Sequence, residues 1–170
     1  VLGQVAALAV AEVVRQLVPG DVRIKWPNDV LVGRRKVAGI LIKNEVVGEW
    51  VQSSVVGIGI NANSSGFPEE LVATSIQLEA GHAVPLGQLR EDVCAALERY
   101  WVMREHDTPG LAEAYAGQLW MRGRWADLLL DGRSITARPV DVDLSGRLLV
   151  EEEGGGVAAY GLDRLRFAPR

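Results

Sequence analysis

The chain has 170 residues, of which 48% are apolar and 24% charged, values ordinary for a globular protein with one core or two small ones. Its net charge of −4 gives no support for a nucleic-acid partner, because such proteins usually carry a basic face. No apolar run reaches the roughly 18 residues of a membrane span and no signal peptide is visible, so we expect no membrane partner.

The first half of the chain alternates between helical and extended patterns. Apolar residues at three- and four-residue spacing predict a helix over residues 1–17, which Pro19-Gly20 ends. Alternation over residues 22–25 indicates a half-buried strand, and residues 30–43 favour a hairpin that turns at Gly33. A further strand pair is expected at Glu45 to Val47 and Trp50 to Asn61.

In the second half of the chain, the pattern of apolar residues changes from helical to strand-like near Arg124. Residues 69–80 predict a short helix or a capped turn, and longer helices are expected within residues 86–120. Short apolar runs separated by turn residues then favour a small all-β barrel, with a boundary near Gly123. The expected fold class is α/β (α+β): a mixed sheet packed by helices over residues 1–123, and a barrel over residues 124–170.

The residues that bind metals or form disulfides are scarce. One cysteine, Cys94, excludes internal disulfides and fits a reducing, cytoplasmic compartment; we interpret it as a core thiol. His82 and His106 have no cysteine or carboxylate at metal-ligand spacing, so no protein metal site is expected.

Two glycines mark a candidate binding surface. Strand alternation over residues 55–60 places Gly57 and Gly59 on one face, where either a flat ligand or a packed helix could approach closely. Asn61 ends that strand, and Lys25 ends an earlier one. A cation beside a glycine-floored sheet suits a flat anionic ligand such as a nucleotide or an acyl-adenylate. Taken alone, Lys25 fits a solvated strand-end lysine better.

The order of four motifs favours a ligand-binding role for Lys25 over that of a solvated strand-end lysine. Lys25-Trp26-Pro27-Asn28-Asp29 is followed by Ala38 to Leu41, by Gly57 to Asn61 and by Ala73 to Ile76. This order and spacing resembles that of biotin protein ligases, most strongly over residues 22–76 and more weakly over nearly the whole chain. The resemblance implies a fold of the biotin/lipoate ligase (class II synthetase-like) type, with part of the catalytic domain before Gly123 and an SH3-like barrel after it.

The resemblance also implies a reaction. The carboxylate of biotin attacks the α-phosphate of ATP to give biotinyl-5′-adenylate, and a lysine of a carrier domain then attacks this anhydride. ATP and biotin would be substrates, with Mg²⁺ accompanying ATP. The partner would be the biotin carboxyl-carrier domain of acetyl-CoA carboxylase or a related carboxylase, and a homodimer is possible.

Site residues are carried over by position. The resemblance implies that Lys25 contacts the biotin carboxylate and the α-phosphate in catalysis. Asn28 and Asp29 would shape the adjacent turn, with Asp29 a possible acceptor near the incoming lysine, or a turn residue only. Gly39 would let the backbone approach the biotin pocket. The nucleotide would lie over or beside the residues that end the later strand, Gly57, Gly59 and Asn61.

The chain departs from the family pattern at two places. The family's Gly- and Arg-rich loop, which closes over the adenylate, would lie before Val1, so we expect the 170-residue chain to be inactive or weakly active by itself. Lys43 stands where the family usually has glutamate, which puts an acidic role there in doubt. Two alternatives stay open: a lipoate or octanoate transferase, and a module that docks a carrier domain or dimerises without turnover.

Overall fold

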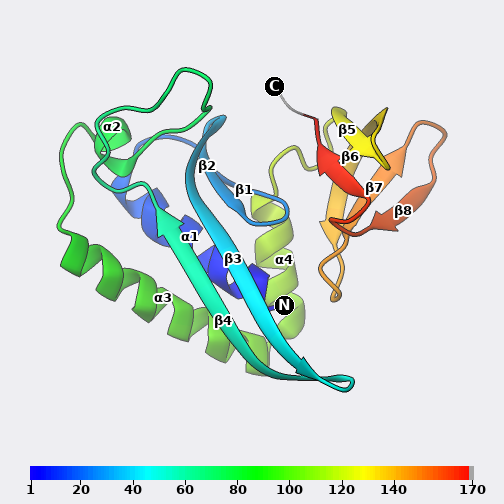
Figure 1. The fold of residues 1–170 in the computed structure, drawn as a ribbon, viewed down its shortest axis with the longest axis horizontal. Helices are drawn as coiled ribbons and strands as arrows, with labels where there is room; N and C mark the ends of the chain where they lie inside the picture. The colour runs from blue at the N-terminus through cyan, green and yellow to red at the C-terminus, as the bar shows by residue number, and fades with distance from the viewer. Residues whose placement is uncertain (169–170) are drawn as a thin grey trace.

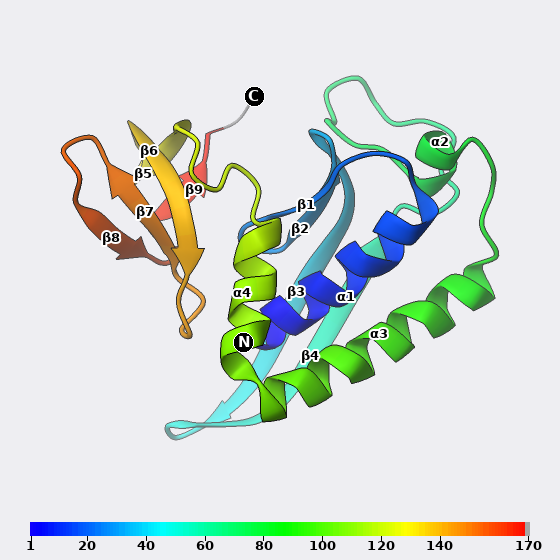
Figure 2. The same cartoon turned by 180° about the vertical axis from the view of Figure 1, so that it is seen from behind.

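A computed structural model describes residues 1–168 as two antiparallel sheets and four helices. Helix α1 (Leu2–Leu17) packs on the first sheet, and helices α3 (Leu86–His106) and α4 (Thr108–Gln118) pack on α1 (Figure 2). The short helix α2 (Ile76–Ala80) begins at the N-cap Ser75, whose hydroxyl accepts from the Leu78 amide. Within residues 1–168, no helix combines the length and the hydrophobicity needed to cross a membrane.

Helix α1 forms the centre of the core. The residues from Gln4 to Ala11 are all buried, so the helix is enclosed nearly all round rather than along the single apolar face predicted from its spacing. The sheet covers one side of it, and α3 and α4 cover the others.

The first sheet contains β1 (Val22–Lys25), β2 (Asp29–Val32), β3 (Arg35–Val47) and β4 (Trp50–Ile60), in that spatial order. Each neighbouring pair is antiparallel, so the expected mixed sheet is wrong for the described residues. The physical reason is the length of the connections: tight turns join antiparallel neighbours, whereas parallel strands need long crossovers. The two extended pieces expected on either side of Asn44 form one strand, β3, which pairs with β4 along that length.

The two faces of this sheet differ. Ala38 and Ile40 are buried against the helical layer, whereas Leu41 and Val55 are exposed on the opposite face. Figure 1 shows that open face toward the viewer, with α1 behind it. The alternation predicted around the two glycines therefore holds, and their face is the exposed one.

The second sheet contains five antiparallel strands in the order β8-β7-β6-β5-β9. These strands are β5 (Ala126–Leu130), β6 (Arg133–Val142), β7 (Leu148–Glu152), β8 (Val157–Tyr160) and β9 (Leu165–Phe167). Strands β8 and β9 are the two edges, so the expected barrel is not closed among the strands of residues 1–168. Leu128, Leu148 and Leu165 are fully buried and form the core of this sheet.

One local expectation holds in part and another is wrong. The short helix expected within residues 69–80 is present as α2, but it begins only at Ile76, and the stretch 69–75 is a loop. Cys94 is exposed rather than buried, because α3 buries only the stripe that contains Leu89 and Val93, and the residue after Val93 points away from it.

Candidate functional site

Four of the residues singled out from the sequence lie in one row across the first sheet. Lys25 is the cross-strand partner of Asp29, Asp29 of Gly39, and Gly39 of Gly59. Residues directly opposite each other in an antiparallel pair point to the same face, and strands lie about 4.8 Å apart, so the row is about 14 Å long. It presents a cation, then a carboxylate, then a bare glycine surface.

The glycine part of the row is open. A Cβ at Gly57 would lie 3.6 Å from the carbonyl oxygen of Leu41, and one at Gly59 would lie 3.9 Å from that of Gly39. No helix of the described residues packs against these glycines. A hollow of about 470 Å³ lies over them, and its lining includes Asn28.

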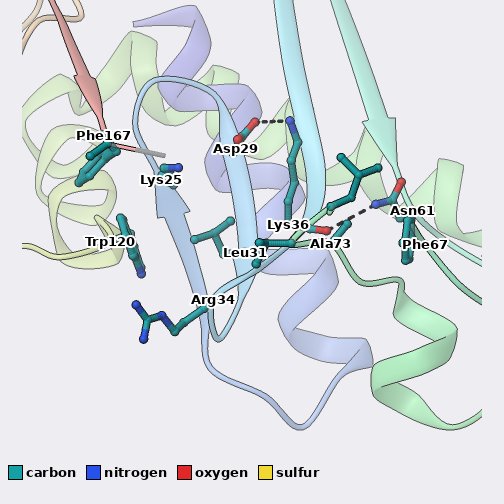
Figure 3. Close-up of a pocket in the computed structure, with 13 residues that line it drawn as sticks. Lys25, Asp29, Leu31, Arg34, Lys36, Asn61, Phe67, Ala73, Trp120 and Phe167 are labelled. Atoms are coloured by element: carbon teal, nitrogen blue, oxygen red, sulfur yellow. Dashed lines mark hydrogen bonds and ion pairs between the residues drawn. The ribbon is translucent and has the colours of Figure 1, made fainter. Parts of the chain in front are cut away.

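Gly39 makes room for a side chain. A Cβ there would lie 2.9 Å from the Nζ atom of Lys36 and 3.6 Å from Oδ1 of Asp29. The Lys36 ammonium forms an ion pair with that carboxylate, with 2.6 Å between Nζ and Oδ1 (Figure 3). The sequence analysis missed Lys36, because regular alternation would place it on the same face as the buried Ala38. A lysine close before the Ala-Gly-Ile-Leu motif was the available signal.

A second hollow, also of about 470 Å³, lies between the two sheets (Figure 3). Its charged lining contains three cations, Lys25, Arg34 and Lys36, and one carboxylate, Asp29. The remaining walls are mostly apolar: Leu31, Asn61, Phe67, Leu71, Val72, Ala73, Trp120, Phe167 and Ala168. The excess of positive charge suits an anion, and Lys36 lines both hollows.

Two predicted amide residues hold the backbone around the row. Asn28 donates its side-chain amide to the carbonyl of Ile40 at 2.7 Å, and the Ile40 amide donates to the Asn28 carbonyl at 2.8 Å. These two bonds join the turn that contains Asn28 to β3. Asn61 lines the second hollow and donates its side-chain amide to the carbonyl of Thr74 at 3.0 Å, which ties the end of β4 to the following loop.

Aromatic rings flank Lys25. Its Nζ atom lies 5.6 Å from the ring centroid of Trp120 and 5.5 Å from that of Phe167, within the range of cation–π attraction. The two rings meet edge to face, with centroids 4.9 Å apart. Trp120 follows α4 and Phe167 belongs to β9, and no local pattern in the sequence connects either of them with Lys25.

The next residue of the motif also contacts the second sheet. Trp26 is buried and donates its indole N–H to the carbonyl of Gly146 at 2.9 Å, in the turn between β6 and β7. Trp26, Gly146 and Tyr115 of α4 line a further hollow, and burial raises the pKa of the Tyr115 phenol. The Lys-Trp-Pro-Asn-Asp run is therefore held by both sheets.

Comparison with known proteins shows which proteins this chain resembles. Residues 1–61 match the Biotin/lipoate A/B protein ligase family, a range that contains all seven predicted site residues. The chain is 31% identical to the bifunctional ligase/repressor BirA of Bacillus subtilis (strain 168), over 93% of this chain and 50% of that protein. It is 34% identical to the biotin--[acetyl-CoA-carboxylase] ligase of Mycobacterium tuberculosis (strain ATCC 25618 / H37Rv), over 90% of this chain and 57% of that protein. The chain is a relative of the biotin protein ligases.

Solved structures show the same fold. The apo biotin protein ligase of Aquifex aeolicus superposes with a TM-score of 0.81 at 23% identity, over 99% of this chain and 75% of that one. The biotin protein ligase of the same organism in complex with biotin and ATP gives a TM-score of 0.79 at 24% identity, over 98% and 71%. The chain spans about half the length of the curated biotin ligases that it matches.

Proposed function

We propose that this chain binds biotinyl-5′-adenylate over the exposed glycine face and takes part in the ATP-dependent transfer of biotin to a lysine of a biotin carboxyl-carrier domain. The observation that carries the proposal is the single row that joins Lys25, Asp29, Gly39 and Gly59. A flat ligand fits over the bare part of that row, and the cation at its end suits the phosphate of an adenylate. The named activities of the sequence relatives support the same reaction.

Lys25 is the catalytic residue of this proposal. In the first step a carboxylate oxygen of biotin forms a bond to the α-phosphorus of ATP, and the bond to the leaving pyrophosphate breaks. In the second step the lysine nitrogen of the carrier bonds to the acyl carbon, AMP leaves with the electron pair, and the nitrogen loses a proton. Negative charge builds on the phosphate in both steps, and a positioned ammonium stabilises it.

The metal of the reaction would arrive with the nucleotide. Among residues 1–168, no group of three His, Cys, Asp or Glu side chains is arranged to hold a metal ion. Asp29 is the sole acidic side chain among the described residues that line the hollow between the sheets. These donors suit Mg²⁺ held mainly by phosphate oxygens, which is a common mode for this ion.

The second sheet has a supporting role in this proposal. We assign it to an incomplete SH3-like barrel that positions Lys25 and Trp26, because Phe167 and Gly146 contact these two residues. Carboxylase carrier domains are the proposed partners of the open face beside it.

Ligand binding tests the proposal without depending on the transfer step. Calorimetric titration of the 170-residue chain with biotinyl-5′-adenylate should show binding, and lipoyl-5′-adenylate should bind more weakly. Lys25→Ala should weaken biotinyl-adenylate binding by roughly tenfold to a hundredfold, the cost of one charge-assisted contact. Lys25→Arg should restore only part of the loss, because a planar guanidinium replaces a compact ammonium.

Lys43→Ala is the matched control, since Lys43 is exposed on the same sheet and lines neither hollow. Where pyrophosphate exchange is measured, Lys25→Ala should lower its rate by about two to three orders of magnitude with an unchanged melting temperature. Tighter binding of lipoyl-5′-adenylate would favour a lipoate transferase. Absence of binding of either adenylate, or normal binding by a folded Lys25→Ala protein, would contradict the proposal.

A further inference from the structure

A β-bulge decides where the side chain of Lys36 points. Val30 pairs with Ala38 but the next residue, Leu31, pairs with Lys36, so Val37 has no partner on β2. In a regular strand Lys36 would share the buried face of Ala38. An extra residue in one strand reverses this alternation and re-aims the side chains that precede it. The bulge therefore places a lysine on the exposed face, beside the row that contains Asp29.

The backbone of Lys36 is fixed on both sides. Leu31 of β2 is its partner on one side, and on the other the loop after β4 forms a parallel bridge at Ala73. The Lys36 amide donates to the carbonyl of Val72, and the Thr74 amide donates to the carbonyl of Lys36, both at 2.9 Å. Only the side chain is left to move, and its ammonium lies in the space that a Cβ at Gly39 would fill.

The ion pair that holds this ammonium is a weak one. The side chains of Lys36 and Asp29 are 46% and 23% exposed. Ion pairs with this access to water contribute little net stability, so a stronger anion can replace the carboxylate at small cost. Lys36 lies between the hollow over the glycines and the hollow that contains Lys25 and Arg34. Together with Lys25 and Arg34 it makes three cations on the lining of the second hollow, so a polyphosphate placed there would have more than one cation to pair with.

We propose that Lys36 is a second phosphate-binding residue, which Asp29 holds until nucleotide binds and which then pairs with the oxygens of the leaving pyrophosphate. This inference rests on the proposed function and adds a residue that contacts the leaving group. Lys25 serves the α-phosphate in both steps, whereas Lys36 serves only the phosphates that depart in the first. Loss of Lys25 should therefore weaken the binding of every nucleotide that has an α-phosphate, whereas loss of Lys36 should weaken only the binding of nucleotides with further phosphates.

Comparison of MgATP with AMP tests this division. Lys36→Met keeps the aliphatic stem and removes the charge, and it should weaken MgATP binding by roughly tenfold to a hundredfold, as expected for a lost charge-assisted contact. AMP binding should stay within about twofold of that of the unchanged chain, since its single phosphate belongs to Lys25. Lys43→Met removes the same charge from the same strand, away from both hollows, and should change neither affinity.

Asp29→Asn should change the affinity for MgATP in the opposite direction. Without the carboxylate, nucleotide binding no longer has to break the ion pair, so MgATP should bind a few-fold more tightly while AMP binding is unchanged. A Lys36 that only stabilised the fold would not produce this gain. Equal loss of MgATP and AMP binding in Lys36→Met, no loss of either, or weaker MgATP binding in Asp29→Asn would each overturn the inference while leaving the proposed function intact. Failure of the unchanged chain to bind either nucleotide would contradict both.

Discussion

The ring centroid of Phe167 lies 5.5 Å from the ammonium nitrogen of Lys25, so the last strand of the second sheet contacts the lysine that ends the first strand of the other. Trp120 contacts the same ammonium, and its ring meets that of Phe167 edge to face. The two rings restrict where the lysine can point. The second sheet thereby contacts the candidate lysine through the side chain of Phe167.

Phe167→Leu should weaken binding of biotinyl-5′-adenylate. Leucine fills much of the same volume but has no π-face. A cation–π contact contributes about 0.5 kcal/mol where it is exposed and about 2 kcal/mol where it is partly desolvated. We therefore expect a loss of roughly twofold to thirtyfold in affinity by calorimetry. Phe167→Tyr keeps the ring and is the control. Equal loss in both variants would show that the cation–π contact is not what matters.

Trp26→Phe should destabilise the fold by removing one hydrogen bond and part of a buried ring system. The indole N–H of Trp26 donates to the carbonyl of Gly146 at 2.9 Å, and phenylalanine lacks both this donor and the second ring of the buried side chain. The free energy of unfolding in a denaturant titration should fall by at least about 1 kcal/mol, the net contribution of one hydrogen bond, to which the lost packing adds.

The matched control is Trp125→Phe, because Trp125, which directly precedes β5, is 47% exposed. It should change the free energy of unfolding by less than about 0.5 kcal/mol, as is usual for surface substitutions. If the two substitutions cost the same, the hydrogen bond to Gly146 does not anchor the motif.

Gly59→Val should separate stability from binding. A Cβ at this position meets only a carbonyl oxygen at 3.9 Å, so the folded sheet has room for it. Glycine weakens strands and valine favours them, and the free energy of unfolding should stay level or rise by up to about 1 kcal/mol. The same side chain fills the floor of the proposed site and should abolish adenylate binding.

Ser53→Val is the control for Gly59→Val. It adds a branched apolar side chain to the exposed part of β4, outside both hollows, and should leave adenylate affinity unchanged. Normal adenylate binding by a stable Gly59→Val protein would place the ligand elsewhere.

Local patterns in the sequence account for the elements but not for how the site is assembled. Alternation over a few residues was enough to predict β1 and the placement of both glycines on one face, and Pro19-Gly20 was enough to predict the end of α1. The two hairpins were predicted with the right direction, but the mixed sheet was wrong, because alternation carries no information on which further neighbour a strand pairs with. Closure of the second sheet depends likewise on contacts between its edges, which the spacing of turns does not report.

The residues missed at the site have two physical origins. Lys36 depends on a bulge at Val37, and a one-residue shift reverses every assignment to a face before it. Phe167 and Trp120 reach Lys25 only because the two sheets lie side by side, a contact between segments far apart in the sequence. The motif residues could be found because four of them belong to a local meander of strands, whose registers follow from its short turns.

The central claim is that the row from Lys25 to Gly59 forms the floor of an adenylate site. Amide NMR spectra of the 170-residue chain, recorded during titration with biotinyl-5′-adenylate, test it most directly. The account predicts that the largest shift changes fall on Gly39, Gly57 and Gly59 and on the amides next to Lys25, and that α3 and the β7–β8 edge stay unchanged. Changes confined to α3, to the β7–β8 edge or to no residue at all would contradict it.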